Sequence, residues 1–318
     1  MRYFVLFLIA LGACKSSTDF NTTSSNGSGG VARYVLVGTS DSAAVYYTNN
    51  QGVTWQRAKI TLTGGQKVWG FASWGSETYC SAPGAGVFLS NDSGQTWVKL
   101  QYPGHAAHGI TVFDSALYVA DNNDGLYVSS DHGITWDLRG SQLCGSYVHG
   151  FVSSGSTLLA CTERRGIAIS QNKGVFWDAR DTNQTGLKDV HALSVNSTGI
   201  YAGATAQWLL RSTDQGTSWQ SVSFSNFSQT VWALLSSDSM MYAGTSQGVF
   251  RSATRGLNWS PFTSTLSTGD VHALANDGVN VYAGTNGDGV FRSGDKGLSW
   301  LPVNTGLANH TVSAMIAR

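Results

Sequence analysis

The chain contains little charge, little proline and little cysteine. Only 12% of its 318 residues are charged, and it has 4 prolines and 4 cysteines, whereas soluble domains average about 25% charged residues. The 19 basic and 19 acidic residues balance, and no basic run is present. The electrostatic footprint of a nucleic-acid-binding protein is therefore missing, and we expect no nucleic-acid partner. The same composition argues against a coiled coil, a helical bundle and a charge-rich disordered chain.

The sequence also lacks the motifs of several common chemistries. It has no nucleophile elbow, no P-loop and no metal-ligand spacing, so we expect neither a metal nor a cofactor. Apolar material is ample, with 42% hydrophobic residues and 11 tryptophans, and there are 38 glycines. The length suits two average domains or one large all-β domain.

The first residues have the form of a secretory signal. Arg2 supplies a positive charge, and residues 3–11 form an apolar run that is too short to span a bilayer. The next four residues, Leu11-Gly12-Ala13-Cys14, resemble the lipobox of bacterial lipoproteins. That resemblance implies cleavage after Ala13 and a lipid on Cys14. Ordinary signal-peptide cleavage after Ala13 is the alternative.

The stretch that follows has the composition of a linker. Residues 15–30 are rich in Ser, Thr, Asn and Gly and contain one aromatic residue, Phe20. They cannot bury enough apolar area to order themselves. We therefore predict a signal peptide over 1–13, a lipidated Cys14 with a flexible tether over 14–31, and a globular body over 32–318. Lys15 resembles the signal for outer-membrane sorting, which implies a location in the bacterial cell envelope, with the side of the membrane left open.

From residue 32 onward the chain repeats. The signature is Ser/Thr-x-Asp-x-Gly-x-Thr/Ser-Trp, and its tryptophans are spaced by 39 to 42 residues; they are Trp55, Trp97, Trp136, Trp177, Trp219, Trp259 and Trp300. A period near 40 with a Trp signature indicates propeller blades or a solenoid. These residues resemble the Asp-box, also called the bacterial neuraminidase repeat, over residues 32–318. Seven copies in phase imply a single seven-bladed β-propeller.

The acidic position of the repeat is occupied by Asp or Asn in six copies and by Thr254 in the other; the six are Asn50, Asp92, Asp131, Asn172, Asp214 and Asp295. We interpret these residues as parts of a turn. The side chain can accept backbone N–H bonds, the Gly permits a positive φ, and the Trp fills the space beneath. The alternative is a set of catalytic or calcium-binding carboxylates.

Each period also predicts four antiparallel strands, named A to D from the axis outward. In the last complete period strand A lies near 271–275, B near 281–285, C near 289–293, and D begins at Trp300. The body begins with a B strand, near 33–39, and ends with an A strand, near 312–316. We therefore expect the C-terminal strand to complete the first blade and close the ring. The predicted fold is all-β.

One position of strand A is unusually rich in aromatic and imidazole side chains. The second residue of the strand is, blade by blade, Trp69, His108, His149, His191, Trp232, His272 and Ser313. Equivalent positions form a ring near the axis, on the face that family resemblance implies for ligands, opposite the Asp-box turns. One interpretation is a ligand-binding ring that stacks on a sugar or hydrogen-bonds a polar ligand. The other is packing between blades. Asp189 and Asp270 precede His191 and His272 by two residues, which suits carboxylate–imidazole pairing that could raise the imidazole pKa or orient the ring.

Two loops on the same face carry further candidates. Trp208 stands where the other blades have Gly or Ala, so a protruding ring is predicted, with packing beneath a neighbouring loop as the alternative. Glu163, Arg164 and Arg165 form the densest charge cluster of the chain and could bind an anionic or polyol ligand, or be merely solvated.

Three cysteines remain in the body, namely Cys80, Cys144 and Cys161. An odd number in an exported protein allows one disulfide at most. The repeat register makes Cys144 and Cys161 the candidate pair, because it places them near facing ends of adjacent strands.

Several functions occur on Asp-box propellers. Sialidases resemble the repeat, but their pattern has six blades and an Arg-Ile-Pro segment, and no Pro here follows Ile. Xyloglucan-cleaving hydrolases resemble it closely, but they place their carboxylates between two propellers. Single seven-bladed propellers of the photosystem II assembly factor type fit best. In those proteins an arginine patch marks the face that binds the partner, and only a fragment of such a patch, Arg164 and Arg165, is present in this sequence.

We therefore predict a lipid-anchored, monomeric, non-catalytic propeller that binds a glycan or an envelope or extracellular protein. One alternative is a glycoside hydrolase that uses Asp189, Asp270 or Glu163 as acid and base. The other is a scaffold for envelope protein assembly.

Overall fold

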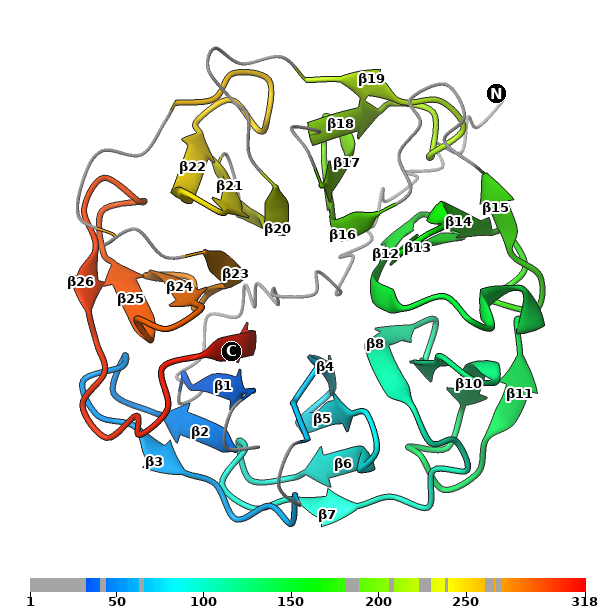
Figure 1. The fold of residues 1–318 in the computed structure, drawn as a ribbon, viewed down its shortest axis with the longest axis horizontal. Helices are drawn as coiled ribbons and strands as arrows, with labels where there is room; N and C mark the ends of the chain where they lie inside the picture. Colours follow the sequence, from blue (N-terminus) through cyan, green and yellow to red (C-terminus); the bar gives the residue numbers. More distant parts are fainter. Residues whose placement is uncertain are drawn as a thin grey trace, which may run out of the picture.

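The computed structural model describes residues 33–40, 44–62, 66–180, 189–205, 209–222, 230–237, 240–260, 266 and 270–318. The described residues form seven antiparallel sheets arranged around a central axis, which confirms the seven-bladed β-propeller (Figure 1). The predicted signal peptide, Cys14, the tether and Trp208 lie outside the described residues. None of the described residues belongs to a helix long and apolar enough to cross a membrane.

The blades are built alike, from an inner strand A outward. Strand A is β4 (Gly70–Trp74), β8 (Ala107–Phe113), β12 (Val148–Ser154), β16 (Val190–Asn196), β20 (Val231–Ser237), β23 (Val271–Asn276) and β27 (Val312–Ala317). Strand B is β1 (Val35–Thr39), β5 (Glu77–Ala82), β9 (Ala116–Asp121), β13 (Thr157–Thr162), β17 (Gly199–Ala204), β21 (Met240–Thr245) and β24 (Val281–Thr285).

The outer half of each blade is shorter. Strand C is β2 (Val45–Thr48), β6 (Gly86–Ser90), β10 (Gly125–Ser129), β14 (Gly166–Ser170), β18 (Leu209–Ser212), β22 (Gly248–Ser252) and β25 (Val290–Ser293). Strand D is β3 (Gln56–Arg57), β7 (Val98–Lys99), β11 (Asp137–Arg139), β15 (Asp178–Arg180), β19 (Gln220–Ser221) and β26 (Leu301–Pro302). The blade of β20–β22 has three described strands, and Ser260 bridges to Arg251 where its strand D would lie. A 3-10 helix, η1, spans Ser141–Leu143.

The C-terminal strand closes the ring as predicted. β27 pairs with β1 in the sheet β27-β1-β2-β3, with Val35 opposite Ala317 and Val37 opposite Met315. Tyr34 and Arg318 add two backbone hydrogen bonds beyond the strand ends, at 2.8 and 2.9 Å. Figure 1 shows β27 beside β1, although the two strands come from opposite ends of the chain. The closure leaves no unpaired edge on β1, which would otherwise be open to association.

The hydrophobic core lies between neighbouring blades. The inner strands are apolar along most of their length, and the second strands bury large rings against the next blade; those of Tyr79, Tyr118, Tyr201, Tyr242 and Tyr282 are among the largest fully buried side chains. Outer strands are exposed, as in β7 and β26. Burial on both faces explains why the inner strands read as continuous apolar runs instead of alternating patterns.

The Asp-box residues form the turn between strands C and D. In the second blade the Asp92 carboxylate accepts hydrogen bonds from the Thr96 N–H and hydroxyl, at 2.9 and 2.6 Å, and from the Ser90 hydroxyl at 2.8 Å. The Trp97 indole N–H donates to the Gly94 carbonyl. Gly94 has a φ of 84°, and a Cβ there would lie 2.3 Å from Leu36 of the first blade. The turn therefore needs glycine both for its backbone and for its packing against the preceding blade.

The same side-chain acceptor pattern recurs in the other boxes. It uses the carboxylate or amide oxygens of Asn50, Asp131, Asn172, Asp214 and Asp295. In the degraded box the Thr254 hydroxyl accepts the Asn258 N–H instead, at 2.7 Å. These hydrogen bonds show that the Asp and Asn side chains stabilise the turns, as the first of the two interpretations of the repeat predicts.

The disulfide predicted between Cys144 and Cys161 is wrong, because both thiols are free in the structure. A β-bulge between Val148 and Gly150 places Gly150, not Val148, opposite Cys161. The buried Cys161 thiol donates to the Gly150 carbonyl, while the exposed Cys144 thiol donates to the Asn123 carbonyl of the neighbouring blade. The two sulfurs are therefore directed to different partners.

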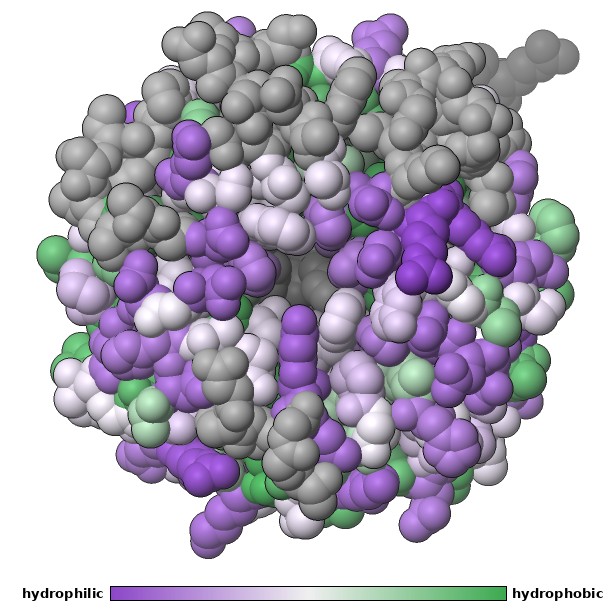
Figure 2. Space-filling view, in the orientation of Figure 1, coloured by the Kyte–Doolittle hydropathy of each residue, from purple (hydrophilic) through white to green (hydrophobic). Residues whose placement is uncertain are grey.

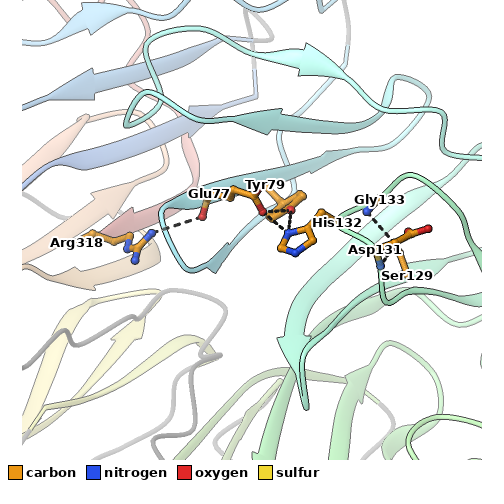
Figure 3. Close-up of polar contacts among 7 residues, drawn as sticks. All are labelled: Glu77, Tyr79, Ser129, Asp131, His132, Gly133 and Arg318. Carbon is orange, nitrogen blue, oxygen red and sulfur yellow. Dashed lines mark hydrogen bonds and ion pairs between the residues drawn. The ribbon is translucent and has the colours of Figure 1, made fainter.

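A polar cluster joins three blades on the Asp-box side (Figure 3). His132 Nδ1, from the third box, lies 2.6 Å from the Glu77 carboxylate, to which the Tyr79 hydroxyl also donates at 2.5 Å. The His132 ring stacks on Trp74 with centroids 3.9 Å apart. Arg318 at the C-terminus donates to the carbonyls of Glu77 and Gly75. The cluster ties the closing strand to the second and third blades.

Candidate functional site

The predicted ring residues lie where the inner strands begin. In β12 the pairing with β13 shifts between Val148 and Gly150, so that His149 is the extra residue of a β-bulge. The same shift brackets His191, Trp232 and His272. A bulge leaves one residue outside the ladder and re-aims its side chain. The bulges therefore set these side chains apart from the alternating packing of the strands.

The ring side chains contact one another around the axis. Trp69 and His149 stack at 5.6 Å with an interplanar angle of 24°. Neighbouring pairs continue round the axis with centroids 5.0, 4.6 and 4.9 Å apart, between His149 and His191, His191 and Trp232, and Trp232 and His272. Ser313 occupies the remaining position of the ring, and its hydroxyl is within hydrogen-bonding distance of the carbonyls of Gly38 and Val68, to which it can donate. Rings of neighbouring blades are therefore in contact, and the ring also lines a cavity.

That cavity, here called the central mouth, has a volume of about 320 Å³. It is lined by Lys67, Trp69, His149, Glu163, His191, Trp232, His272 and Ser313. Figure 2 shows the hollow in the middle of one face, surrounded mainly by hydrophilic side chains. The strand register places the mouth opposite the Asp-boxes. Val148, beside His149, pairs with Thr162, which in turn pairs with Gly166, whereas the box begins at Ser170 at the far end of β14. His108 does not line the cavity; it is buried, with its Nδ1 2.6 Å from the Ala106 carbonyl.

The imidazoles of the central mouth are neutral at physiological pH. Burial lowers the pKa of His149 to about 3 and that of His191 to about 4. Burial also lowers the pKa of His108 and His272. Desolvation disfavours the charged form of a base, and repulsion between a charged His149 and charged forms of His191, His108 and Lys67 adds to the effect. Neutral imidazole offers one donor and one acceptor nitrogen, so the ring is a polar surface without net charge.

Several polar atoms of the ring have no hydrogen-bond partner among the described residues. They are Trp69 Nε1, His149 Nε2, His191 Nδ1, Trp232 Nε1 and His272 Nε2. A buried polar group without a partner costs about 1–3 kcal/mol. The ring therefore contains buried polar atoms whose hydrogen-bonding capacity is not used within the described residues. In the part of the chain that the structure describes, no group of three or more His, Cys, Asp or Glu could hold a metal ion.

The predicted carboxylates are used in different ways. Asp189 accepts a hydrogen bond from the backbone N–H of Arg164 at 2.8 Å, which joins strand A of one blade to the B–C loop of the blade before it. Asp270 Oδ2 lies 3.8 Å from His272 Nε2, the pairing that the spacing suggested. The ring of His191 instead contacts the Thr205 hydroxyl through Nε2, at 2.9 Å. Burial outweighs the neighbouring carboxylate at both histidines, so the pKa of neither is raised, which was one of the two roles that the spacing suggested.

The charge cluster of the fourth blade is divided among separate contacts. Glu163 lines the central mouth. The Arg164 guanidinium lies over the Tyr147 ring at 5.9 Å, and Arg165 donates to the Gln142 carbonyl. Trp208, the remaining loop candidate, lies outside the described residues.

Lys67 is the lining residue that sequence reasoning missed. Its ammonium lies 4.6 Å from the centroid of the Trp69 ring, and no ion pair joins it to another described residue. The surrounding walls lower its pKa through desolvation. Lys67 precedes Trp69 by two residues, as Asp189 and Asp270 precede their histidines, and this spacing was the signal that could have found it.

Comparisons with known proteins recover the repeat and the fold. The family model described as "BNR/Asp-box repeat" matches residues 127–138. No curated protein matches the chain in sequence. Among solved structures, the chain is similar to YCF48 bound to a D1 peptide, with a TM-score of 0.63 and 13% identity, covering 80% of this chain and 94% of that one.

Two further solved structures share the fold. A GH74 xyloglucanase from Xanthomonas campestris has a TM-score of 0.64 and 17% identity, covering 86% of this chain and 53% of that one. The extracellular domain of a putative one component system, BT4673 from B. thetaiotaomicron, has a TM-score of 0.64 and 11% identity, covering 79% and 38%. This chain thus spans about half of the xyloglucanase and less of the BT4673 domain. At these identities the likeness shows the fold alone.

Proposed function

We propose that the protein is an exported, lipid-anchored binding propeller without catalytic activity, and that the central mouth holds its ligand. One observation carries this proposal: four bulged strands and a neighbouring tryptophan assemble aromatic and neutral imidazole rings around one cavity, and one nitrogen of each of these five rings has no hydrogen-bond partner among the described residues. Aromatic surface with a few convergent polar groups is the usual character of a small-ligand site.

The chemistry of the mouth favours a glycan. Sugars present a weakly apolar ring face together with hydroxyl groups that both donate and accept hydrogen bonds. The indole and imidazole surfaces of Trp69, Trp232 and the histidines suit the first feature. The charged groups of Lys67 and Glu163, which line the cavity, suit the second.

A bound peptide is the second candidate. The similar fold of YCF48 is solved with a D1 peptide, and Lys67 supplies a cation for a carboxylate. Assembly of envelope proteins would be one use of such binding.

The arrangement of carboxylates argues against a glycoside hydrolase. Hydrolysis by paired carboxylates needs two of them about 5–10 Å apart on either side of the bond. Of the three candidates, only Glu163 is among the described residues that line the mouth. Asp189 is held by a backbone N–H. The described residues form one propeller, so the cleft between two propellers found in related hydrolases has no counterpart in them.

We would test the proposal by affinity electrophoresis through gels that contain soluble polysaccharides. The full chain with Cys14→Ser, which prevents acylation, should be retarded by at least one glycan. Trp232→Ala should weaken that retardation about tenfold or more, because truncating a tryptophan at the centre of a binding site typically costs about 2 kcal/mol or more.

Trp74→Ala is the matched control, since Trp74 is also half-buried but lies on the Asp-box side, against His132. Equal losses in the two variants would contradict binding at the mouth. No retardation by any glycan would remove the glycan as ligand. Pull-down from envelope extracts, with loss of the partner in Trp232→Ala, would then identify the protein ligand.

A further inference from the structure

The Asp-box turns expose aliphatic side chains at one repeated position. The residue after the box glycine is apolar in five of the seven blades, and each of these side chains is about half exposed or more: Val53, Ile134, Val175, Leu257 and Leu298, at 58, 75, 56, 49 and 58%. Phe176 beside Val175 is 55% exposed. A single exposed apolar side chain needs no explanation, but these five recur at the same position of turns that lie on one face of the propeller.

The residue before the box glycine adds positive charge to the same turns. It is Lys173, Arg255 and Lys296 in three of the blades that carry an aliphatic residue, and His132 in a fourth. All four residues have positive φ, and all four are exposed. Lys173 pairs with Asp114 at 2.5 Å, and His132 with Glu77. No ion pair joins Arg255 or Lys296 to another described residue.

The N-terminal segment joins the propeller on this face. Val35, where β1 begins, pairs with Thr48, the first residue of the first Asp-box. The backbone of Tyr34 is hydrogen-bonded to that of Arg318. The Tyr34 hydroxyl lies 2.8 Å from Thr78 Oγ1, and Thr78 lies between Glu77 and Tyr79 of the cluster in Figure 3. The chain therefore enters β1 at the Asp-box face, while the central mouth opens on the opposite face.

We propose that the Asp-box face rests on the lipid bilayer that holds the anchor, with the central mouth directed away from it. The proposal depends on the lipid anchor proposed above. The exposed aliphatic residues stand in separate blades around the axis, so a flat, laterally continuous partner can reach several of them at once. Aliphatic side chains partition into the interface of a bilayer, and neighbouring Lys and Arg are attracted to anionic headgroups.

The tether supports the same orientation. A Ser/Gly-rich chain of the length of residues 14–31 has an r.m.s. end-to-end distance of about 25 Å. Its point of attachment on the Asp-box face therefore stays close to the anchored Cys14. To turn the central mouth toward the bilayer, the tether would have to run past the whole height of the propeller.

The test uses the acylated mature chain in vesicles of phosphatidylethanolamine and phosphatidylglycerol that contain a spin-labelled lipid. In one sample a fluorophore is placed on the native, exposed Cys144. This residue follows η1 and contacts Asn123 in a B–C loop, so it lies on the mouth side. In the other sample the fluorophore is placed on the cysteine introduced by Leu298→Cys, with Cys144→Ser to remove the native site. Quenching at position 298 should be at least about threefold stronger than at Cys144, since only the docked face approaches the lipid. Equal quenching, or stronger quenching at Cys144, would overturn the docking face.

A matched pair of variants separates the turn residues from general surface polarity. Val53→Asp with Leu257→Asp should reduce quenching at position 298 to the level of Cys144. Val98→Asp with Leu301→Asp, whose side chains are 68 and 60% exposed on the outer strands, should leave it unchanged. Equal effects of the two pairs would overturn the role of the turns. The mass of the mature chain tests the anchor separately: an acylated chain without preferential quenching overturns only the docking face, and an unacylated chain overturns both.

Discussion

The histidines of the central mouth owe their neutrality to burial. Charging His149 or His191 means placing a cation among aromatic rings, away from water. The carboxylate of Asp189 favours protonation of His191, but desolvation is the larger effect. A ring of neutral imidazoles suits an uncharged, hydroxyl-rich ligand, because it presents donors and acceptors without attracting counterions.

This burial predicts how stability depends on pH. The pKa of His149 falls from 6.5 to about 3 on folding, and that of His191 from 6.5 to about 4. Between these values the unfolded chain binds more protons than the folded one, so the free energy of unfolding falls as pH decreases from about 6.5 to about 4. Urea denaturation across this range should show the decline, and His149→Gln should make it shallower. His105→Gln, at an exposed histidine outside the mouth, is the control, and an equal effect there would contradict the argument.

Single residues also show where sequence reasoning had to stop. Four histidines at one repeated position indicated a ring, because repeats make positions equivalent. The disulfide prediction failed over one residue, since the bulge at His149 shifted Gly150 opposite Cys161. A bulge depends on the partner strand and leaves little trace in local composition.

At the scale of elements, the Asp-box turn and the β-bulge define the two ends of each blade. The turn is local, with its donors and acceptors all within a few residues, as between Ser90 and Thr96. Its signature is therefore legible in the sequence. Strands A to C of the last complete blade were also predicted within a residue of their observed bounds, because valine runs and glycines delimit them. The short outer strands are less predictable, since they are exposed and held by few pairs.

Removing the carboxylate of an intact Asp-box should lower the free energy of unfolding more than removing the Thr254 hydroxyl of the degraded box. Asp92→Ala removes the acceptor of three hydrogen bonds, two of them from Thr96. It should lower the free energy of unfolding by about 1–2 kcal/mol, since the Thr96 N–H loses its partner. Thr254→Ala removes a hydroxyl that also makes three hydrogen bonds, with Ser252 and with the Asn258 N–H and carbonyl, but it should cost less because hydrogen bonds to a charged carboxylate are stronger than those to a neutral hydroxyl. Chemical denaturation of both variants gives the comparison; equal costs would mean that the carboxylate adds nothing to the turn.

At the scale of the whole molecule, stability depends on closing the ring. β27 buries Val312, Ala314, Met315 and Ile316, and it contributes Ser313 to the central mouth. Its pairing with β1 joins residues from the two ends of the chain. Each blade packs on two neighbours, so an open ring would expose apolar faces of the first and last blades as well as a free strand edge.

Removal of residues 312–318 should therefore destabilise the whole propeller. We expect the melting temperature to fall by on the order of 10 °C or more, because several buried side chains are lost together. We also expect self-association through the free edge of β1. Calorimetry and light scattering measure the two effects. Deletion of Arg318 alone removes its hydrogen bonds to Tyr34, Glu77 and Gly75 but leaves β27 paired with β1, so it should lower the melting temperature much less. A chain without residues 312–318 that stays monomeric and melts as the full chain does would contradict the role of closure.

The sequence alone determined the number of blades, the closing strand, the turn residues and the position of the ring. These follow from periodicity and from contacts between residues close in the chain, which repeat seven times. Tertiary structure decided the rest. Five of the six aromatic and imidazole residues of the ring line the cavity together with Lys67, whereas His108 is buried. The thiols of Cys144 and Cys161 stay apart, and the effect of burial on the pKa of His191 exceeds that of the Asp189 carboxylate. Those outcomes depend on bulges and on the packing of one blade against the next, over distances in the chain that no local pattern encodes.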